Sequence, residues 1–343
     1  MTESIAAYLL FLAKTLTGVV ALLLAVAGVL ALARAARQAR PPDSVEVEHL
    51  NDHFRALADT LREATLDAPA LKALRKTRRK EEKARLKHPV DPLRARVFVL
   101  SFKGDLQASG VDRLREEITT LLQVATPQDE VVLRLESEGG VVHGYGLAAS
   151  QLTRIKARGL SLTVAVDKVA ASGGYMMACV ADRILAAPFA ILGSIGVVAQ
   201  LPNFNRWLQR HAIDFEMHTA GEYKRTLTLF GENSDAARAK FREELDETHT
   251  LFKHFVAEHR PQLDIGSVAT GEHWFGVQAL ERKLVDELRT SDDYLLARAE
   301  KAELYALHYR RQRKLAERLS RGLVRLGGGL RQGLDSAVTR RWT

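Results

Sequence analysis

A serine between glycines, placed just after a strand-like run, is the first feature that could do chemistry. Ser172 is followed by Gly173 and Gly174, and it lies between the β-rich run 162–166 and the apolar segment 175–181. A sharp turn between a strand and a helix can expose a serine nucleophile beside the unpaired N–H groups of the helix start. The pattern favours acyl transfer, although Ser-Gly-Gly alone is also typical of an ordinary turn.

A second glycine turn follows another strand-like run. Gly139 and Gly140 come after the run 131–135, and glycine lets a backbone N–H approach a ligand without a Cβ in the way. Together, the two turns would supply two donors aimed at one developing oxyanion. Such donors are usually the largest contribution to acyl-transfer catalysis.

Other residue types offer competing chemistry. Cys179, the only cysteine, lies in an apolar run and is predicted to be a packed side chain. Lys168 precedes Ser172 by four residues, and we expect it to face away or to pair with Asp167. A Ser–His scheme stays open, although lone histidines are usually structural. The histidines that could take part are His143, His211, His218 and His273. No zinc spacing, Walker loop or dinucleotide fingerprint is present, so neither a metal nor a cofactor is expected.

The elements that must position these residues begin near residue 96. The runs 97–100, 131–135 and 162–166 have the residue types and lengths of strands, and helical segments near 111–123 and 142–157 separate them. Such alternation predicts an α/β domain with crossover helices and a largely buried sheet.

A second uncharged stretch, residues 184–201, is long enough by hydropathy alone to cross a membrane. It contains Pro188, Gly193 and Gly196, which break a helix. We therefore interpret it as a buried strand–turn–strand of the α/β domain.

Residues 1–34 are predicted to be a transmembrane anchor. Residues 16–33 form an uncharged stretch rich in Leu, Val and Ala that is long enough to span a bilayer. No basic segment precedes it, which argues against a cleaved signal peptide. Arginines follow it, which would leave the bulk of the protein in the cytoplasm, but this rule weakens before a large folded domain. The side of the membrane is left open.

The basic charge lies in two flanking segments. The net charge is +8, yet residues 72–87 alone hold nine Lys/Arg against two Glu, and residues 310–341 hold ten against two acidic residues. The rest of the chain is net acidic. We interpret residues 35–92 as a charged stalk and 301–343 as a basic tail. Such segments contact lipid headgroups or are solvated, and no specific nucleic-acid binding is expected.

Several separate motifs, in one order, resemble the signal peptide peptidase A family. The resemblance covers essentially the whole chain, including the anchor and the stalk, and is strongest with the inner-membrane, single-repeat members of Gram-negative bacteria. The motifs that carry it are residues 167–178 with Ala-Ala-Ser-Gly-Gly-Tyr, 193–197, 221–225, 271–276 and 284–286.

The resemblance implies a fold and an activity. Residues 93–300 are expected to form a Clp protease/crotonase-like spiral domain, in a protein anchored in the bacterial inner membrane by one span. The implied activity is that of a serine endopeptidase with a Ser-Lys dyad, which hydrolyses peptides or membrane-proximal protein fragments through an acyl-enzyme.

The family also implies roles for individual residues. Ser172 would be the nucleophile, Lys224 the general base, and Ser194 the auxiliary serine that holds the lysine amine. The oxyanion donors would be the N–H of Gly173 and one from the turn of Gly139 and Gly140. A lysine, with a pKa of about 10.4 in solution, needs burial that lowers its pKa by roughly three units before it can act as a base at neutral pH.

One position departs from the family pattern. Glu138 stands where family members commonly have the proline of Ser-Pro-Gly-Gly. An inward carboxylate would oppose the oxyanion, whereas an outward one removes only some backbone constraint, and we expect it to face solvent.

Two alternatives stay open: a crotonase-like acyl-thioester enzyme, which needs no nucleophilic serine, and a non-catalytic membrane scaffold that retains the fold.

The chain has room for one copy of the spiral domain. Because larger family members combine a serine and a lysine from two copies, the resemblance implies a homo-oligomeric ring in which Lys224 reaches Ser172 of a neighbouring protomer. A monomer in which the two residues meet within one chain is the alternative.

Overall fold

The computed structural model describes residues 12–24, 26–28, 44–87 and 95–310. Two units are distinguished, residues 45–309 and the remaining terminal segments. In the terminal unit, residues 12–24 and 26–28 are helical and exposed. The expected span 16–33 lies partly outside the described residues, as does the tail from residue 311. No helix in the described ranges combines the length and the apolar character needed to cross a bilayer.

The main unit is built on a seven-stranded sheet with the strand order β1-β10-β2-β3-β4-β6-β9. The pairs from β10 to β9 are all parallel. The predicted strands 97–100, 131–135 and 162–166 are confirmed as parts of β2, β3 and β4. The strands are β1 (Ser44–His49), β2 (Arg96–Lys103), β3 (Glu130–Glu136), β4 (Ser161–Val166), β6 (Arg183–Ala186), β9 (Glu287–Leu288) and β10 (Glu303–Arg310).

Both faces of this sheet are buried, which explains the near-continuous apolar runs of its strands. Leu100 and Leu133 face one core, where α4 (Val111–Leu121) and α5 (Val142–Ala157) pack. Val99 and Val132 face the opposite core, which α2 (Leu50–Thr65) and α11 (Ser291–Ala299) help to cover. The helices expected near 111–123 and 142–157 are thus confirmed. The mixed α/β architecture with a parallel-rich sheet fits the expected Clp protease/crotonase-like fold.

The main unit includes two segments that lie outside the expected spiral domain 93–300. β1 and α2 come from the expected stalk, and β10 comes from the expected tail. β10 pairs with β2, and its Leu304 and Ala306 are buried. The folded unit therefore extends past residue 300, because a strand inserted between β1 and β2 cannot be separated from the core. The charged part of the stalk forms the helix α3 (Ala68–Lys87).

A smaller sheet lies next to Ser172, which directly follows its first strand. It consists of β5 (Val169–Ala171), β7 (Ile191–Gly193) and β8 (His273–Phe275), with β5 parallel and β8 antiparallel to β7. The uncharged stretch 184–201 includes most of β6 and all of β7 with a turn between them, which confirms the buried strand–turn–strand prediction for residues 184–195, whereas residues 198–201 are exposed. Three short helices complete this region: α6 (Gly173–Ala178), α9 (Ile265–Val268) and α10 (Gly276–Glu281).

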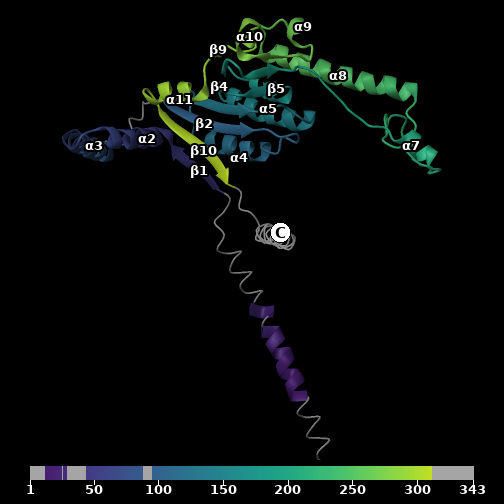
Figure 1. Ribbon diagram of the computed structural model, residues 1–343, viewed down its shortest axis with the longest axis horizontal. Coiled ribbons are helices and arrows are strands. Elements are labelled where there is room, and N and C mark those ends of the chain that lie inside the picture. The colour runs from purple at the N-terminus through teal and green to yellow at the C-terminus, as the bar shows by residue number, and fades with distance from the viewer. Residues whose placement is uncertain (1–11, 25, 29–43, 88–94, 311–343) are drawn as a thin grey trace, which may run out of the picture. The chain divides into compact units, whose positions relative to one another are not determined.

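Residues 197–234 form an excursion that we call the arm. The arm leaves the domain after β7, contains α7 (Asn205–Arg210), and ends at α8 (Asp235–His259). α8 starts at Ser234, whose side chain accepts a hydrogen bond from the Ala237 N–H at 3.2 Å. Figure 1 shows α7 away from the main sheet, beyond the N-terminal end of α8. Many apolar side chains of the arm are exposed: Val198, Leu201, Phe204, Trp207, Ile213, Phe215, Met217, Tyr223, Leu229 and Phe230.

Candidate active site

Ser172 lies at the sharp turn between β5 and α6, as its sequence setting predicts. Its backbone has φ 52° and ψ −119°, a positive-φ conformation that non-glycine residues rarely adopt. Such a conformation costs about 1–3 kcal/mol and is concentrated at functional sites. The turn is held by the Ser172 N–H, which donates to Gly193 O at 2.8 Å, and by the Met176 N–H, which donates to Ser172 O at 2.9 Å.

The glycine turn after β3 packs directly against this serine. Gly139 has φ 92°, and a Cβ built on it would lie 2.8 Å from Ser172 Cβ and 2.8 Å from Gly173 N. No side chain fits there, so the backbones of two segments distant in sequence are in contact. The structure thereby brings together Gly139, Gly173 and Ser172.

Two N–H groups on the segments that meet here, those of Gly140 and Gly173, have no acceptor among the described residues. The N–H of Gly139 is used differently, because it donates to Ser137 Oγ at 3.1 Å. The turn is fixed on both sides: Ala171 N–H donates to Ser137 O at 3.0 Å, and Val141 N–H donates to Leu106 O at 2.9 Å. Two unpaired donors beside a serine can stabilise an oxyanion.

Glu138, at the position of the family's proline, is exposed. Its carboxylate therefore faces solvent, as expected, and the turn's order comes from the hydrogen bonds of Ser137 and Val141.

Ser194 is a close neighbour of Ser172. Ala171 pairs with Gly193 across the parallel strands β5 and β7, so Ser172 and Ser194 are the next residues on adjacent strands. Ser194 also has a positive φ of 51°, and its N–H donates to Glu272 O at 2.6 Å. Both serines are half-buried. The structure therefore places the expected auxiliary serine beside the expected nucleophile.

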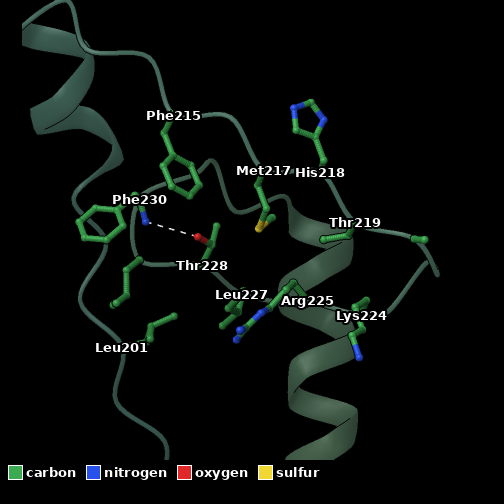
Figure 2. A pocket seen from close by; sticks show the side chains of 12 residues that line it. Leu201, Phe215, Met217, His218, Thr219, Lys224, Arg225, Leu227, Thr228 and Phe230 are labelled. Carbon is green, nitrogen blue, oxygen red and sulfur yellow. Dashed lines mark hydrogen bonds between the residues drawn. The ribbon is translucent and has the colours of Figure 1, made fainter.

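Lys224 lies in the arm and is exposed. It lines a pocket of about 750 Å³ whose lining residues all come from residues 201–230. Figure 2 shows the Lys224 ammonium directed away from the rings of Phe215 and Phe230 in this pocket. No residue of the Ser172 turn contributes to the pocket, so the structure of one chain does not bring Lys224 to Ser172.

The competing residues have other partners. Lys168 pairs with Glu136 at 3.1 Å, rather than with Asp167, whose carboxylate accepts from the N–H and hydroxyl of Ser291. Cys179 is buried, and burial raises the pKa of its thiol, which confirms that it is a packed side chain. Among the described histidines none is hydrogen-bonded to Ser172, and in the same ranges no cluster of His, Cys, Asp or Glu could hold a metal ion.

Two residues of the site were not singled out from the sequence. Ser137 and Tyr145 are buried, and their hydroxyl oxygens lie 2.6 Å apart directly behind the glycine turn. The available signal was weak: a serine that ends a strand run, and a tyrosine on a helix face otherwise formed by small and aliphatic residues.

Comparison with known proteins adds an independent observation. The family model described as "Peptidase family S49 N-terminal" matches residues 3–152, and "Peptidase family S49" matches residues 154–305. A relative named "Probable protease SohB" from Haemophilus influenzae is 46% identical over 331 residues, which cover 94% of this chain and 93% of the relative.

Two further relatives agree with these matches. The "Probable protease SohB" of Buchnera aphidicola from Acyrthosiphon pisum is 60% identical over 225 residues, 66% of this chain and 67% of the relative. A "Putative signal peptide peptidase SppA" of Enterococcus faecium is 28% identical over 168 residues, 48% of each chain. The family resemblance carried by the sequence motifs is thereby confirmed, and a relative named SohB matches nearly the whole chain.

Proposed function

Because the chain belongs to peptidase family S49, a family of serine peptidases, we propose that it is a membrane-anchored endopeptidase in which Ser172 is the nucleophile and Lys224 the general base. The observation that carries the proposal is the contact of the Gly139 turn with Ser172, which leaves two backbone donors beside a strained serine. A crotonase-like enzyme would need the donors but not the serine.

The chemistry follows from these positions. Ser172 Oγ attacks the carbonyl carbon of the scissile peptide bond while Lys224 Nζ takes its proton, and the N–H groups of Gly140 and Gly173 donate to the oxyanion. When the tetrahedral intermediate collapses, the leaving amine takes the proton from Lys224 and an ester on Ser172 remains. Water then attacks this ester, again with Lys224 as base, and the acid product leaves with Ser172 regenerated.

Ser194 has the geometry of a residue that positions the base. Its backbone is fixed by the hydrogen bond to Glu272 O, and it follows Gly193, whose carbonyl accepts from Ser172. A hydroxyl there can accept a hydrogen bond from an ammonium or amine that approaches Ser172, which would orient the lysine during proton transfer.

The base is proposed to come from a second copy of the chain, in a closed ring. Three observations support this: Lys224 is exposed, its pocket contains only arm residues, and Trp207 and Phe204 of the arm are 56% and 46% exposed. Clustered apolar surface of this kind typically marks a protein interface. A contact of the arm with the next protomer, repeated until it closes, would cover these side chains and supply the desolvation that a lysine base requires.

The anchor and substrates complete the proposal. Residues 16–33 are uncharged and long enough to span a bilayer, and the basic segment 72–87 would lie near lipid headgroups. Relatives are named as proteases. Substrates would then be peptides or protein fragments at the bacterial inner membrane.

A fluorophosphonate probe tests the proposal. Purified protein in detergent is incubated with the probe, and the labelled residue is identified by peptide mass spectrometry. We expect labelling at Ser172, none in Ser172→Ala, and full labelling in Ser150→Ala, a control serine on α5 whose hydroxyl donates to Gly146 O. Equal labelling of Ser172→Ala and wild type would contradict the proposal. Absence of both labelling and hydrolysis in folded wild-type protein would favour the scaffold alternative.

A further inference from the structure

A buried hydroxyl chain lies directly behind the proposed oxyanion turn. Gly139 N–H donates to Ser137 Oγ at 3.1 Å, Ser137 Oγ lies 2.6 Å from Tyr145 Oη, and Tyr145 Oη donates to Asp105 O at 2.9 Å. Each hydroxyl has a single proton. Because the Tyr145 proton is used on the Asp105 carbonyl, the Ser137 proton must point to Tyr145 Oη, which leaves Ser137 Oγ free to accept from Gly139.

Tyr145 also packs against Gly173, whose N–H is the second proposed oxyanion donor. A Cβ built on Gly173 would lie 2.4 Å from Tyr145 Cγ, so the ring packs directly under the backbone of that residue. The ring itself is completely buried and lies edge-on to Phe102, with 6.4 Å between the ring centroids. One side chain thus contacts Gly173 through its ring and the Gly139 turn through its hydroxyl.

The surrounding backbone leaves space for this chain of hydroxyls. A Cβ on Gly104 would lie 2.3 Å from both Ser137 Oγ and Tyr145 Oη, so only glycine fits there. Gly104 is fixed by its own N–H, which donates to Glu136 O at 2.9 Å. Three segments, the ends of β2 and β3 and the start of α5, therefore meet at the two hydroxyls.

We infer that Tyr145 and Ser137 are positioning residues, which hold the N–H groups of Gly140 and Gly173 at the spacing that the oxyanion requires. The inference rests on the proposed peptidase mechanism at Ser172. Neither hydroxyl touches the substrate: Ser137 acts through Gly139, and Tyr145 acts through Ser137 and through Gly173.

A role as general acid is not consistent with the same geometry. The Tyr145 proton is already donated to a backbone carbonyl, and burial raises the pKa of the phenol. Tyr145 therefore stays neutral across the pH range of a peptidase assay. Its removal should lower turnover by the same factor at every pH, whereas loss of an acid–base group would change the shape of the pH profile.

Tyr145→Phe tests the inference because it removes the hydroxyl and keeps the ring. It leaves the Ser137 proton without an acceptor, and a misplaced oxyanion donor lowers kcat by up to about 100- to 1,000-fold. We expect kcat to fall about 10- to 100-fold, with KM changed less than about two-fold. The matched control is Tyr175→Phe, which removes another buried tyrosine hydroxyl, one that donates to Leu284 O at 2.9 Å instead of to the turn. Its kcat should stay within about two-fold of wild type although its thermal stability falls similarly.

A double-mutant cycle makes the test independent of folding losses. Ser137→Ala should reproduce the loss in kcat, and the double variant with Tyr145→Phe should lose no more than the larger single variant, because both remove one chain. If Tyr145→Phe does not fold, the kcat of Ser137→Ala alone tests the inference. Equal kcat for Tyr145→Phe and Tyr175→Phe, or additive losses in the cycle, would overturn the inference. Activity retained in Ser172→Ala would instead overturn the proposed function, so the two failures are distinguishable.

Discussion

The Ser172 turn and the arm that carries Lys224 differ in how completely one chain determines them. Around Ser172, the backbone of Gly139 packs so closely on Gly173 that a Cβ would not fit. The N–H groups of Ala171, Ser172 and Val141 are hydrogen-bonded to backbone carbonyls. In the arm, the lysine is exposed and large apolar side chains lie on the surface. The proposed nucleophile and the proposed oxyanion donors are held in place within one chain, whereas the proposed base would have to be positioned by whatever covers the arm.

The largest expected effect is that of removing either member of the proposed dyad. Ser172→Ala and Lys224→Ala should each lower kcat/KM by at least about 1,000-fold, because the pair acts as one unit, while circular dichroism and melting temperature stay close to wild type. Lys168→Ala is the matched control, since this lysine is nearer to Ser172 in sequence but pairs with Glu136. If Lys168→Ala were the inactive lysine variant, the base would belong to the core and the contrast with the arm would disappear.

Two glycines with similar positive φ angles compare the regions directly. Gly139 and Gly221 have φ values of 92° and 95°, but a Cβ would meet three atoms at 2.8 Å at Gly139 and nothing within 4 Å at Gly221. Gly139→Ala should lower kcat by about 100-fold or more, because the oxyanion turn must move away from Ser172. Gly221→Ala adds only backbone strain of about 1 kcal/mol and should lower kcat by less than about 10-fold. Similar losses in steady-state assays of the two variants would show that the arm is as closely determined as the core.

The same contrast explains what the sequence could predict. Strand runs, the crossover helices and the glycine turns are local patterns, and they predicted β2, β3, β4 and the meeting of Gly139 with Ser172. The place of β10 between β1 and β2 depends on non-local pairing, so the local sequence of residues 301–310 predicts a tail where the fold has a strand. The hydroxyl chain through Ser137 and Tyr145 was missed because its residues have no spacing signal and meet only in the folded state.

Ser194→Ala probes the point where the two regions would meet. Ser194 belongs to the core, beside Ser172, but its proposed partner comes from the arm. We expect kcat to fall about 10-fold, since a misoriented lysine is still a base. A loss as large as that of Lys224→Ala in the same assay would mean that Ser194 has a role in the chemical step itself.

Glu117→Gln changes the stability of the core and should leave the arm untouched. Glu117 is buried on α4, accepts from Tyr309 N–H at 2.9 Å, and burial raises its pKa from 4.5 to about 7. The folded state then binds a proton that the unfolded state releases, so this group's contribution to stability is fully present below pH 4.5 and is lost as the pH rises through 7.

The melting temperature of wild type should therefore fall between pH 5 and pH 8 relative to that of Glu117→Gln. The corresponding loss in the free energy of unfolding is at most about 3 kcal/mol. Glu116→Gln, one residue earlier and 44% exposed, is the control. Parallel melting curves for wild type and Glu117→Gln across this range would show that Glu117 does not titrate there. Oligomeric state and kcat at pH 7 should be unchanged, which separates core stability from assembly.

The most direct test of a site shared between chains is complementation of two inactive variants. Ser172→Ala and Lys224→Ala chains with different affinity tags are co-expressed, and oligomers that carry both tags are purified and assayed for peptide hydrolysis. In a ring in which the arm of one protomer reaches Ser172 of the next, about a quarter of the interfaces in a random mixture combine an intact serine with an intact lysine. Selecting doubly tagged oligomers removes the inactive homo-oligomers, so their activity should return to at least about a quarter of wild type, while each variant alone stays inactive. Doubly tagged oligomers that remain inactive would contradict the shared site.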